Sequence, residues 1–296
     1  MPQIPDGMSL KSSDYIINPD PGRIMKIDPG RQHLFLSDVH IGAISPRHDR
    51  QLEEQLIDIL EYCETQNWKL YILGDLFDWW MEYPQKHPDL GQRFLEKAEL
   101  YHKNNDPILY ITGNHDNWTR GHLHNYGFEV EHEYRVLQAG EEQIMVFHGD
   151  GLSDTQFGYQ RPLLHRLLRN PRFIKLYQRI LPPSMGWRAM KLFSDFSKWL
   201  ETREPAERAK ILDNWISQLF EKSTFKKVIC GHDHHPRFLS LCRDCQYVNL
   251  GAFFRHKTMA LYTRGNLDLV IWQRNQGVTT IKQSETNKLR TSSDPI

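Results

Sequence analysis

The chain has 296 residues, of which 39% are hydrophobic and 25% are charged, and its 37 Lys and Arg residues balance 37 Asp and Glu residues. This composition is typical of a soluble globular protein, and the length suits one large α/β domain with a full apolar core. Because the net charge is zero, the molecule as a whole does not attract polyanions. We therefore expect no nucleic-acid partner, and any attraction for an anion has to come from a local patch.

The four cysteines, Cys63, Cys230, Cys242 and Cys245, are too few for a disulfide framework and fit a reducing compartment. Cys242 and Cys245 form a single C-x-x-C, which without a second pair favours a hairpin turn over a zinc or redox site. Residues 1–30 contain no apolar run that could act as a signal peptide or a membrane span. We expect a cytoplasmic protein that contacts a membrane only from its surface.

Residues 1–30 are rich in Pro, Asp, Gly and Ser and predict an irregular N-terminal arm. Strand and helix patterns then alternate in the order β-α-β-α-β, which favours right-handed crossovers and a parallel sheet. The predicted strands are 33–37, 69–73 and 107–111, and the predicted helices are 51–66 and 90–104.

Further apolar runs predict five more strands, at 143–147, 226–230, 247–250, 259–262 and 267–272, with the last three forming hairpins or a meander. The fold class is therefore α/β, with two packed sheets flanked by helices. We assign residues 31–282 to this domain and residues 283–296 to a polar, disordered tail.

The segment 153–204 interrupts the strand–helix rhythm. Prolines punctuate an apolar helical pattern, and ten Lys and Arg residues stand against four acids, a local excess of +6. We interpret the segment as a helical cap inserted over the active site. Arginines can hold a pyrophosphate in a bidentate manner, and the apolar residues can line a slot for acyl chains or touch a bilayer. The alternative is an ordinary amphipathic hairpin with a solvated basic face.

Side chains that can bind metals follow the predicted strands in five short blocks. The blocks supply seven candidate ligands, which are Asp38, His40, Asp75, Asn114, His148, His232 and His234. In open α/β sheets, sites lie at the carboxyl ends of strands, so we expect these side chains to converge. One His at a strand end is commonly just hydrogen-bonded. Burying the whole set without a metal would be costly.

The order D-x-H, G-D-x-x-D, G-N-H-D, H-G-D and G-H-x-H resembles the calcineurin-like metallophosphoesterases, from about Leu34 to about Gly251. The resemblance implies a four-layer α/β/β/α sandwich with two divalent metal ions. One ion would take Asp38, His40, Asp75 and His234, and the other Asp75, Asn114, His148 and His232. Asp75 would bridge them. Oxygen and imidazole ligands suit Mn, Fe, Zn or Mg, and we expect Mn first.

The same resemblance implies in-line attack on phosphorus by a hydroxide that bridges the metals. His115 would sit by the leaving group, held by Asp116, as a general acid or electrostatic donor. No Cys or Ser nucleophile is needed.

The chain also resembles the UDP-2,3-diacylglucosamine pyrophosphatases of lipid A synthesis. The features that carry this resemblance are the aromatic residues after Asp75, the Tyr159-Gln160 pair and the helical segment. That family implies hydrolysis of a lipid nucleotide to UMP and a diacyl sugar 1-phosphate, at the cytoplasmic face of the inner membrane. The candidate substrate contacts are Trp79, Tyr159, Arg161, Arg166 and Arg169. Trp79 either lines the substrate entrance or packs under the cap. We identify no obligate protein partner.

Two positions depart from that pattern. His115 stands where well-known members carry Arg, and Gly251-Ala252-Phe253-Phe254 stands where relatives often have Gly-Asp-Trp. These departures keep open a broader phosphodiesterase or phosphomonoesterase that acts on nucleotides or other phosphate esters. A non-catalytic metal-binding scaffold is the weakest alternative, since every ligand position is filled.

Overall fold

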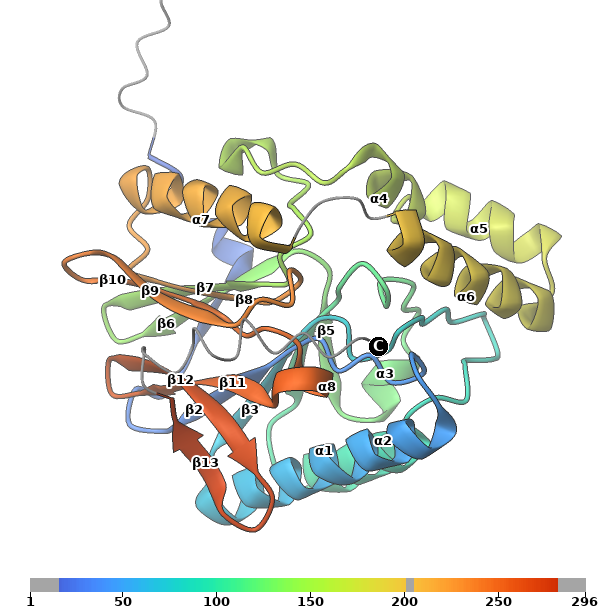
Figure 1. The fold of residues 1–296 in the computed structure, drawn as a ribbon, viewed down its shortest axis with the longest axis horizontal. Helices are drawn as coiled ribbons and strands as arrows, with labels where there is room; N and C mark the ends of the chain where they lie inside the picture. Colours follow the sequence, from blue (N-terminus) through green and yellow to red (C-terminus); the bar gives the residue numbers. More distant parts are fainter. Residues whose placement is uncertain (1–15, 201–204, 282–296) are drawn as a thin grey trace, which may run out of the picture.

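Two β-sheets pack face to face, and helices cover both outer faces (Figure 1). The structure is a computed structural model that describes residues 16–200 and 205–281. Its layers run α/β/β/α, which confirms the predicted fold class. The predicted tail, 283–296, lies outside the described residues, as do residues 1–15 of the predicted arm.

The larger sheet has seven strands, and its central strands are parallel. In spatial order they are β13 (Gly277–Thr280), β12 (Asn266–Gln273), β11 (Thr258–Thr263), β2 (His33–Leu36), β3 (Lys69–Leu73), β4 (Ile108–Ile111) and β5 (Phe128–Glu131). Strands β2, β3 and β4 are buried along their whole length, as expected for parallel strands covered on both faces.

Helices α1 (Pro46–Gln66) and α2 (Gln92–His102) cover the outer face of this sheet, with the short α3 (His122–Asn125) before β5. The helical stripe predicted in 51–66 is confirmed: all five of its residues, Leu52, Leu56, Ile59, Leu60 and Cys63, are buried. The helix begins five residues earlier than predicted, because the side chain of Ser45 caps the backbone N–H of His48 and Pro46 occupies the first turn.

The smaller sheet has six strands and packs its inner face on the larger one. In spatial order they are β1 (Ile24–Lys26), β6 (Tyr134–Ala139), β7 (Glu142–Phe147), β8 (Lys227–Cys230), β10 (Cys245–Asn249) and β9 (Arg237–Cys242). Its outer face packs on α7 (Pro205–Glu221), mainly through Leu212, Trp215, Ile216 and Leu219.

The sequence patterns miss several elements. The predicted irregular arm contains a 3₁₀ turn at Pro21–Arg23 and the strand β1, which pairs in parallel with β6. Strands this short carry too little periodicity to be recognised. Strand β10 does not join β11 and β12 in a meander. It belongs to the other sheet, parallel to β8 and antiparallel to β9.

The C-x-x-C segment forms the turn between β9 and β10, as predicted. A disulfide joins Cys242 to Cys245 across this turn, which the sequence does not predict. Cys63 and Cys230 are buried free thiols.

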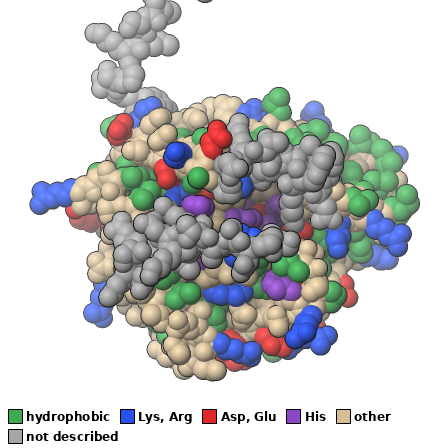
Figure 2. Space-filling model, viewed as in Figure 1, with side chains coloured by type: hydrophobic (Ala, Val, Ile, Leu, Met, Phe, Trp, Pro, Cys, Tyr) green, Lys and Arg blue, Asp and Glu red, His purple; other side chains and the backbone are tan. Residues whose placement is uncertain are grey.

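Three helices lie between β7 and α7, in the segment 153–204, and we call them the cap. They are α4 (Leu163–Leu168), α5 (Pro171–Ile180) and α6 (Pro183–Leu200), preceded by a 3₁₀ turn at Thr155–Phe157. Their inner side chains pack on Met81, Tyr83 and Trp118. Leucines and isoleucines stay exposed on the outside, and Figure 2 shows hydrophobic, Lys and Arg side chains gathered at this end. Within the described ranges, each helix is too short or too polar to cross a bilayer.

Replacing Leu60 by Ala tests the packing of α1. Leu60 is fully buried, so Leu60→Ala should lower the free energy of unfolding by about 2–5 kcal/mol. Leu100→Ala is the matched control, because Leu100 is 55% exposed and the loss should be about 0.5 kcal/mol or less. Chemical denaturation measures both, and equal losses would contradict the packing described here.

Candidate metal centre

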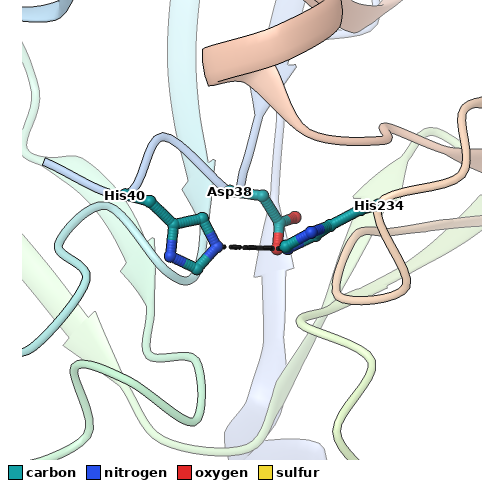
Figure 3. Close-up of side chains that lie close together, drawn as sticks. All are labelled: Asp38, His40 and His234. Carbon is teal, nitrogen blue, oxygen red and sulfur yellow. Dashed lines mark hydrogen bonds and ion pairs between the residues drawn. The ribbon is translucent and has the colours of Figure 1, made fainter. Parts of the chain in front are cut away.

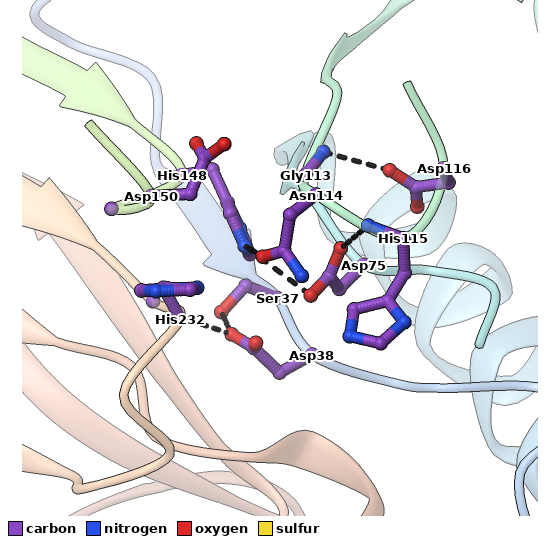
Figure 4. Close-up of polar contacts among 12 residues, drawn as sticks. Ser37, Asp38, Asp75, Gly113, Asn114, His115, Asp116, His148, Asp150 and His232 are labelled. Atoms are coloured by element: carbon purple, nitrogen blue, oxygen red, sulfur yellow. Dashed lines mark hydrogen bonds and ion pairs between the residues drawn. The ribbon is translucent and has the colours of Figure 1, made fainter. Parts of the chain in front are cut away.

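The seven predicted ligands lie at one end of the sandwich, where strands of both sheets finish. Asp38 and His40 follow β2, Asp75 follows β3, Asn114 follows β4, His148 follows β7, and His232 and His234 follow β8. Figure 4 shows most of these side chains converging from separate strand ends. Figure 2 shows His side chains at the centre of the corresponding face.

A first cluster joins Asp38, His40 and His234 (Figure 3). The Oδ1 atom of Asp38 lies 3.2 Å from Nε2 of His234 and 3.8 Å from Nε2 of His40. The two Nε2 atoms are 3.1 Å apart. Three potential ligand atoms from two different sheets therefore face one small space.

A second cluster joins Asp75, His148 and His232, and Asn114 lies beside it. Nε2 of His148 is 3.3 Å from Oδ2 of Asp75 and 3.2 Å from Oδ1 of Asn114. Oδ2 of Asp75 also lies 3.8 Å from Nε2 of His40, in the first cluster. Asp75 thus stands between the two clusters, in the position that a bridging carboxylate needs.

In His148 and His40, the ring nitrogen that faces away from the centre is engaged by the protein. Nδ1 of His148 donates to the carbonyl of Leu73 at 2.9 Å, and Nδ1 of His40 lies 3.2 Å from the carboxylate of Asp78. In metal sites the outward ring nitrogen of a ligating His makes this kind of bond, which leaves the inward nitrogen as the ligand. Oδ1 of Asp38 is buried and accepts no hydrogen bond. The donor set therefore fits divalent cations.

The backbone at the ligands is held in a conformation that L-residues rarely adopt. Nine non-glycine residues of the described ranges have positive φ, and five of them are the predicted ligands Asp38, His40, Asp75, His232 and His234. Such strain persists where the surroundings enforce it, commonly at functional sites. Two glycines allow the close packing: a Cβ at Gly74 would collide with His148, and one at Gly113 with Asp75.

The buried carboxylates of the centre are stabilised by positive charge. Burial raises the pKa of Asp75, but the charges of His148 and His115 outweigh it and hold that pKa well below its usual range. Burial lowers the pKa of His40, yet the neighbouring carboxylates of Asp38 and Asp78 raise it to about 9. Buried carboxylates in this number need cationic partners, and bound divalent cations satisfy the same need.

His115 is oriented by different residues from those predicted. Its Nδ1 lies 2.8 Å from the carbonyl of Asp78 and 3.1 Å from the hydroxyl of Ser194, in α6. Its ring lies edge-on to His40, with centroids 5.1 Å apart. The side chain of Asp116 turns the other way (Figure 4). It accepts hydrogen bonds from the N–H groups of Leu76 and Gly113 and from the hydroxyl of Tyr110.

Asp116 therefore joins the loop after β4 to the loop after β3, and the predicted pairing with His115 is wrong. Burial and the neighbouring charge of Asp75 raise the pKa of Asp116 to about 6. Asp116 cannot hold His115 because its side chain points in the opposite direction, toward the core.

The predicted substrate contacts fall into two groups. Trp79 borders a small cavity over His115, lined also by Asn117, His165 and Met190. Tyr159 lies under α7, where its ring stacks on Trp215 and its hydroxyl donates to the carbonyl of Gly149. These contacts give Tyr159 a packing role, while Trp79 stands beside the centre.

The three arginines surround a second cavity of about 250 Å³, together with Ser153, Thr155 and Gln160. Arg161 is only 3% exposed, and its guanidinium pairs with Glu133 at 2.6 Å and Asp150 at 3.2 Å. Arg169 also pairs with Asp150, at 2.9 Å. Arg166 is exposed and bonds Gln160 and the carbonyl of Arg161. Of the three, Arg166 is best placed to meet a ligand.

Three residues of this region are absent from the sequence-based site. Asp78 contacts His40, Asp150 holds Arg161 and Arg169, and Ser194 contacts His115. The motifs do mark Asp78, as the second acid of G-D-x-x-D, and Asp150, as the acid of H-G-D. Ser194 lies in an unremarkable helix, so its sequence context carries no signal.

Replacing Arg161 and Arg166 in turn distinguishes a structural arginine from one that is available to a ligand. Arg161→Ala leaves Glu133 without its buried cation and removes one of the two arginines that pair with Asp150, so it should lower the free energy of unfolding by about 3–5 kcal/mol. Arg166→Ala should change it by about 0.5 kcal/mol or less, because Arg166 is exposed. Thermal and chemical denaturation check both values. An equal loss for the two variants would contradict this division.

Comparison with known proteins gives the same family as the motifs. The family model of the calcineurin-like phosphoesterases matches residues 33–236. A UDP-2,3-diacylglucosamine hydrolase from Shewanella loihica is 27% identical over 75% of this chain and 88% of its own length. One from Porphyromonas gingivalis is 29% identical over 77% of this chain and 92% of its own length.

Solved structures of similar proteins include a phosphoesterase from E. coli, with a TM-score of 0.41 and 12% identity over 85% of this chain and 98% of that one. A dimetal phosphatase from Danio rerio has a TM-score of 0.40 and 13% identity over 86% of this chain and all of that one. The family match alone covers more than two thirds of the sequence. The chain belongs to the calcineurin-like phosphoesterase family and is a metal-dependent phosphoester hydrolase.

Proposed function

We propose that this enzyme hydrolyses the pyrophosphate of a UDP-diacylglucosamine-type lipid nucleotide, releasing UMP and a diacyl sugar 1-phosphate. The observation that carries the hydrolytic chemistry is the position of Asp75, within 3.8 Å of both His40 and His148. Support for the substrate comes from the relatives named UDP-2,3-diacylglucosamine hydrolase, which match this chain over most of their own length.

The ligand sets proposed are Asp38, His40, Asp75 and His234 for one ion, and Asp75, Asn114, His148 and His232 for the other. Two bound divalent cations, with Mn first among the candidates, would lower the pKa of water to supply a hydroxide and polarise the phosphoryl group. Attack on phosphorus would be in line, and His115 stands beside His40 at the edge of the centre, where its ring could act on the leaving oxygen.

The surroundings suit an amphiphilic, anionic substrate. Arg166 and the neighbouring polar side chains offer donors for phosphate oxygens in the cavity beside the centre. Exposed apolar side chains of the cap, such as Leu163, Leu167 and Ile180, lie among Lys and Arg residues. That mixture suits acyl chains and an anionic membrane surface, which supports our proposal that the enzyme acts at the cytoplasmic face of the inner membrane.

A broader phosphodiesterase or phosphomonoesterase is the second candidate. The ring of Phe254 packs against His40 and His234, with centroids 5.6 and 5.8 Å away. An aromatic wall this close to the ligands, together with His115, suits smaller esters with an apolar or aromatic group. Trp79 borders the cavity on the His115 side.

Replacing Asp75 tests the metal centre. Asp75→Asn removes the shared charge, so bound metal should fall below two equivalents and hydrolysis by about 100-fold or more. Asp244→Asn, at the exposed β9–β10 turn, is the control and should change neither quantity. Elemental analysis and a phosphodiester assay measure them. Full metal content and full activity in Asp75→Asn would refute the assignment.

The substrate is tested with UDP-2,3-diacylglucosamine and Mn, with products identified by mass spectrometry. We expect UMP and the diacyl sugar 1-phosphate, and Arg166→Ala should raise KM about tenfold, as for loss of a charge-assisted hydrogen bond. Turnover of bis(4-nitrophenyl) phosphate but not of the lipid nucleotide would favour the broader esterase. Bound metal without turnover of either substrate would leave a metal-binding scaffold.

A further inference from the structure

Ser194 is a buried polar residue of the cap. It is 5% exposed, whereas Lys191 and Leu192, in the preceding turn of α6, are exposed. Its hydroxyl lies 3.1 Å from Nδ1 of His115, 3.3 Å from the carbonyl of Asp78 and 3.5 Å from Oδ2 of Asp78. The cap thus places one hydroxyl directly on the residues that orient His115.

The contacts of Nδ1 fix how the His115 ring is turned. A carbonyl oxygen only accepts hydrogen bonds, so Nδ1 has to carry the proton that it shares with the carbonyl of Asp78 at 2.8 Å. The Ser194 hydroxyl can accept from the same N–H and donate to Asp78. With Nδ1 held on this side, the ring stands beside His40 and Asp75 at the metal centre.

We propose that Ser194 is a positioning residue, whose hydroxyl, together with the Asp78 carbonyl, sets the orientation of His115 toward the leaving group. This inference rests on the proposed role of His115. It makes the seating of α6 part of the catalytic geometry, because the hydroxyl reaches His115 only when this turn of the cap lies over the loop after β3.

The physical reason is that each added contact narrows the tilt of the imidazole ring. Contacts of Nδ1 with a carbonyl and a hydroxyl on different elements restrict that tilt more than the contact with the carbonyl does by itself. A misplacement of about 1 Å in a catalytic group can lower the rate by up to about 100-fold. The cavity bordered by Met190, Leu168 and Trp79 leaves room for such a shift once the hydroxyl is removed.

The test compares Ser194→Ala and Ser194→Thr on two phosphodiesters that differ in the pKa of the leaving group. One is bis(4-nitrophenyl) phosphate, whose 4-nitrophenolate leaving group needs no proton. The other is a dialkyl phosphodiester, whose alkoxide leaving group needs one. Ser194→Ala should lower kcat on the alkyl ester about tenfold and on the aryl ester about twofold or less, with KM unchanged. Ser194→Thr, which keeps the hydroxyl, should restore kcat.

Matched controls separate positioning from folding. Ser184→Ala lies in the same helix at an exposed position and should leave both substrates unaffected. Melting temperature and metal content should match the parent enzyme in every variant. If Ser194→Ala does not fold, Ser194→Cys keeps the size, weakens the hydrogen bond and takes its place in the comparison.

His115→Ala, alone and combined with Ser194→Ala, completes the experiment. We expect His115→Ala to show the same dependence on the leaving group as Ser194→Ala. Adding Ser194→Ala to His115→Ala should lower kcat no further, as for two residues that act as a unit. Equal loss on both esters, or an effect on KM alone, would overturn the role of Ser194 while leaving His115 in place. If His115→Ala itself shows no dependence on the leaving group, the proposed role of His115 fails, and the inference fails with it.

Discussion

The structure depends on concentrating buried carboxylates and imidazoles where strands of both sheets end. Asp38 and Asp75 are almost inaccessible to solvent, and burial alone would force them to take up protons. The surrounding imidazoles reverse that tendency and keep both carboxylates anionic. Much else follows from this requirement, including the positive φ angles at five of the ligands and the glycines that let His148 and Asp75 pack against the backbone.

The cap is joined to this centre on two sides. On one side Asp150, two residues beyond His148, pairs with Arg161 before α4 and with Arg169 after it. On the other side Ser194 in α6 meets His115. Both attachments use polar groups buried against the ligand-bearing loops. The apolar packing on Met81, Tyr83 and Trp118 also holds the cap on the domain, but through buried apolar surface, which is not directional.

The sequence indicates the fold class and the proposed ligand set because both leave local signatures. Buried parallel strands are continuous apolar runs, and each ligand block directly follows one. The strands β1 and β9 escape because a short or half-exposed strand has no distinctive period. The helix α7 does carry a helical period in Leu212, Trp215, Ile216 and Leu219, so its pattern is available in the sequence, although the predicted elements omit it. The partners of Asp116 and the contact of Ser194 escape for a different reason: they depend on which way one side chain turns after the chain has folded. Arg161 was recognised as basic, but charge alone does not reveal that Glu133, far along the chain, neutralises it.

The first ligand cluster draws Asp38 and His40 from the loop after β2 and His234 from the loop after β8. These strands belong to different sheets, so an ion held there acts as a cross-link between the two halves of the sandwich. By mass action, an ion present at 100 times its dissociation constant adds about 2.7 kcal/mol to the stability of the folded state. The availability of metal would then govern the lifetime of the folded protein in the cell as well as its rate of turnover.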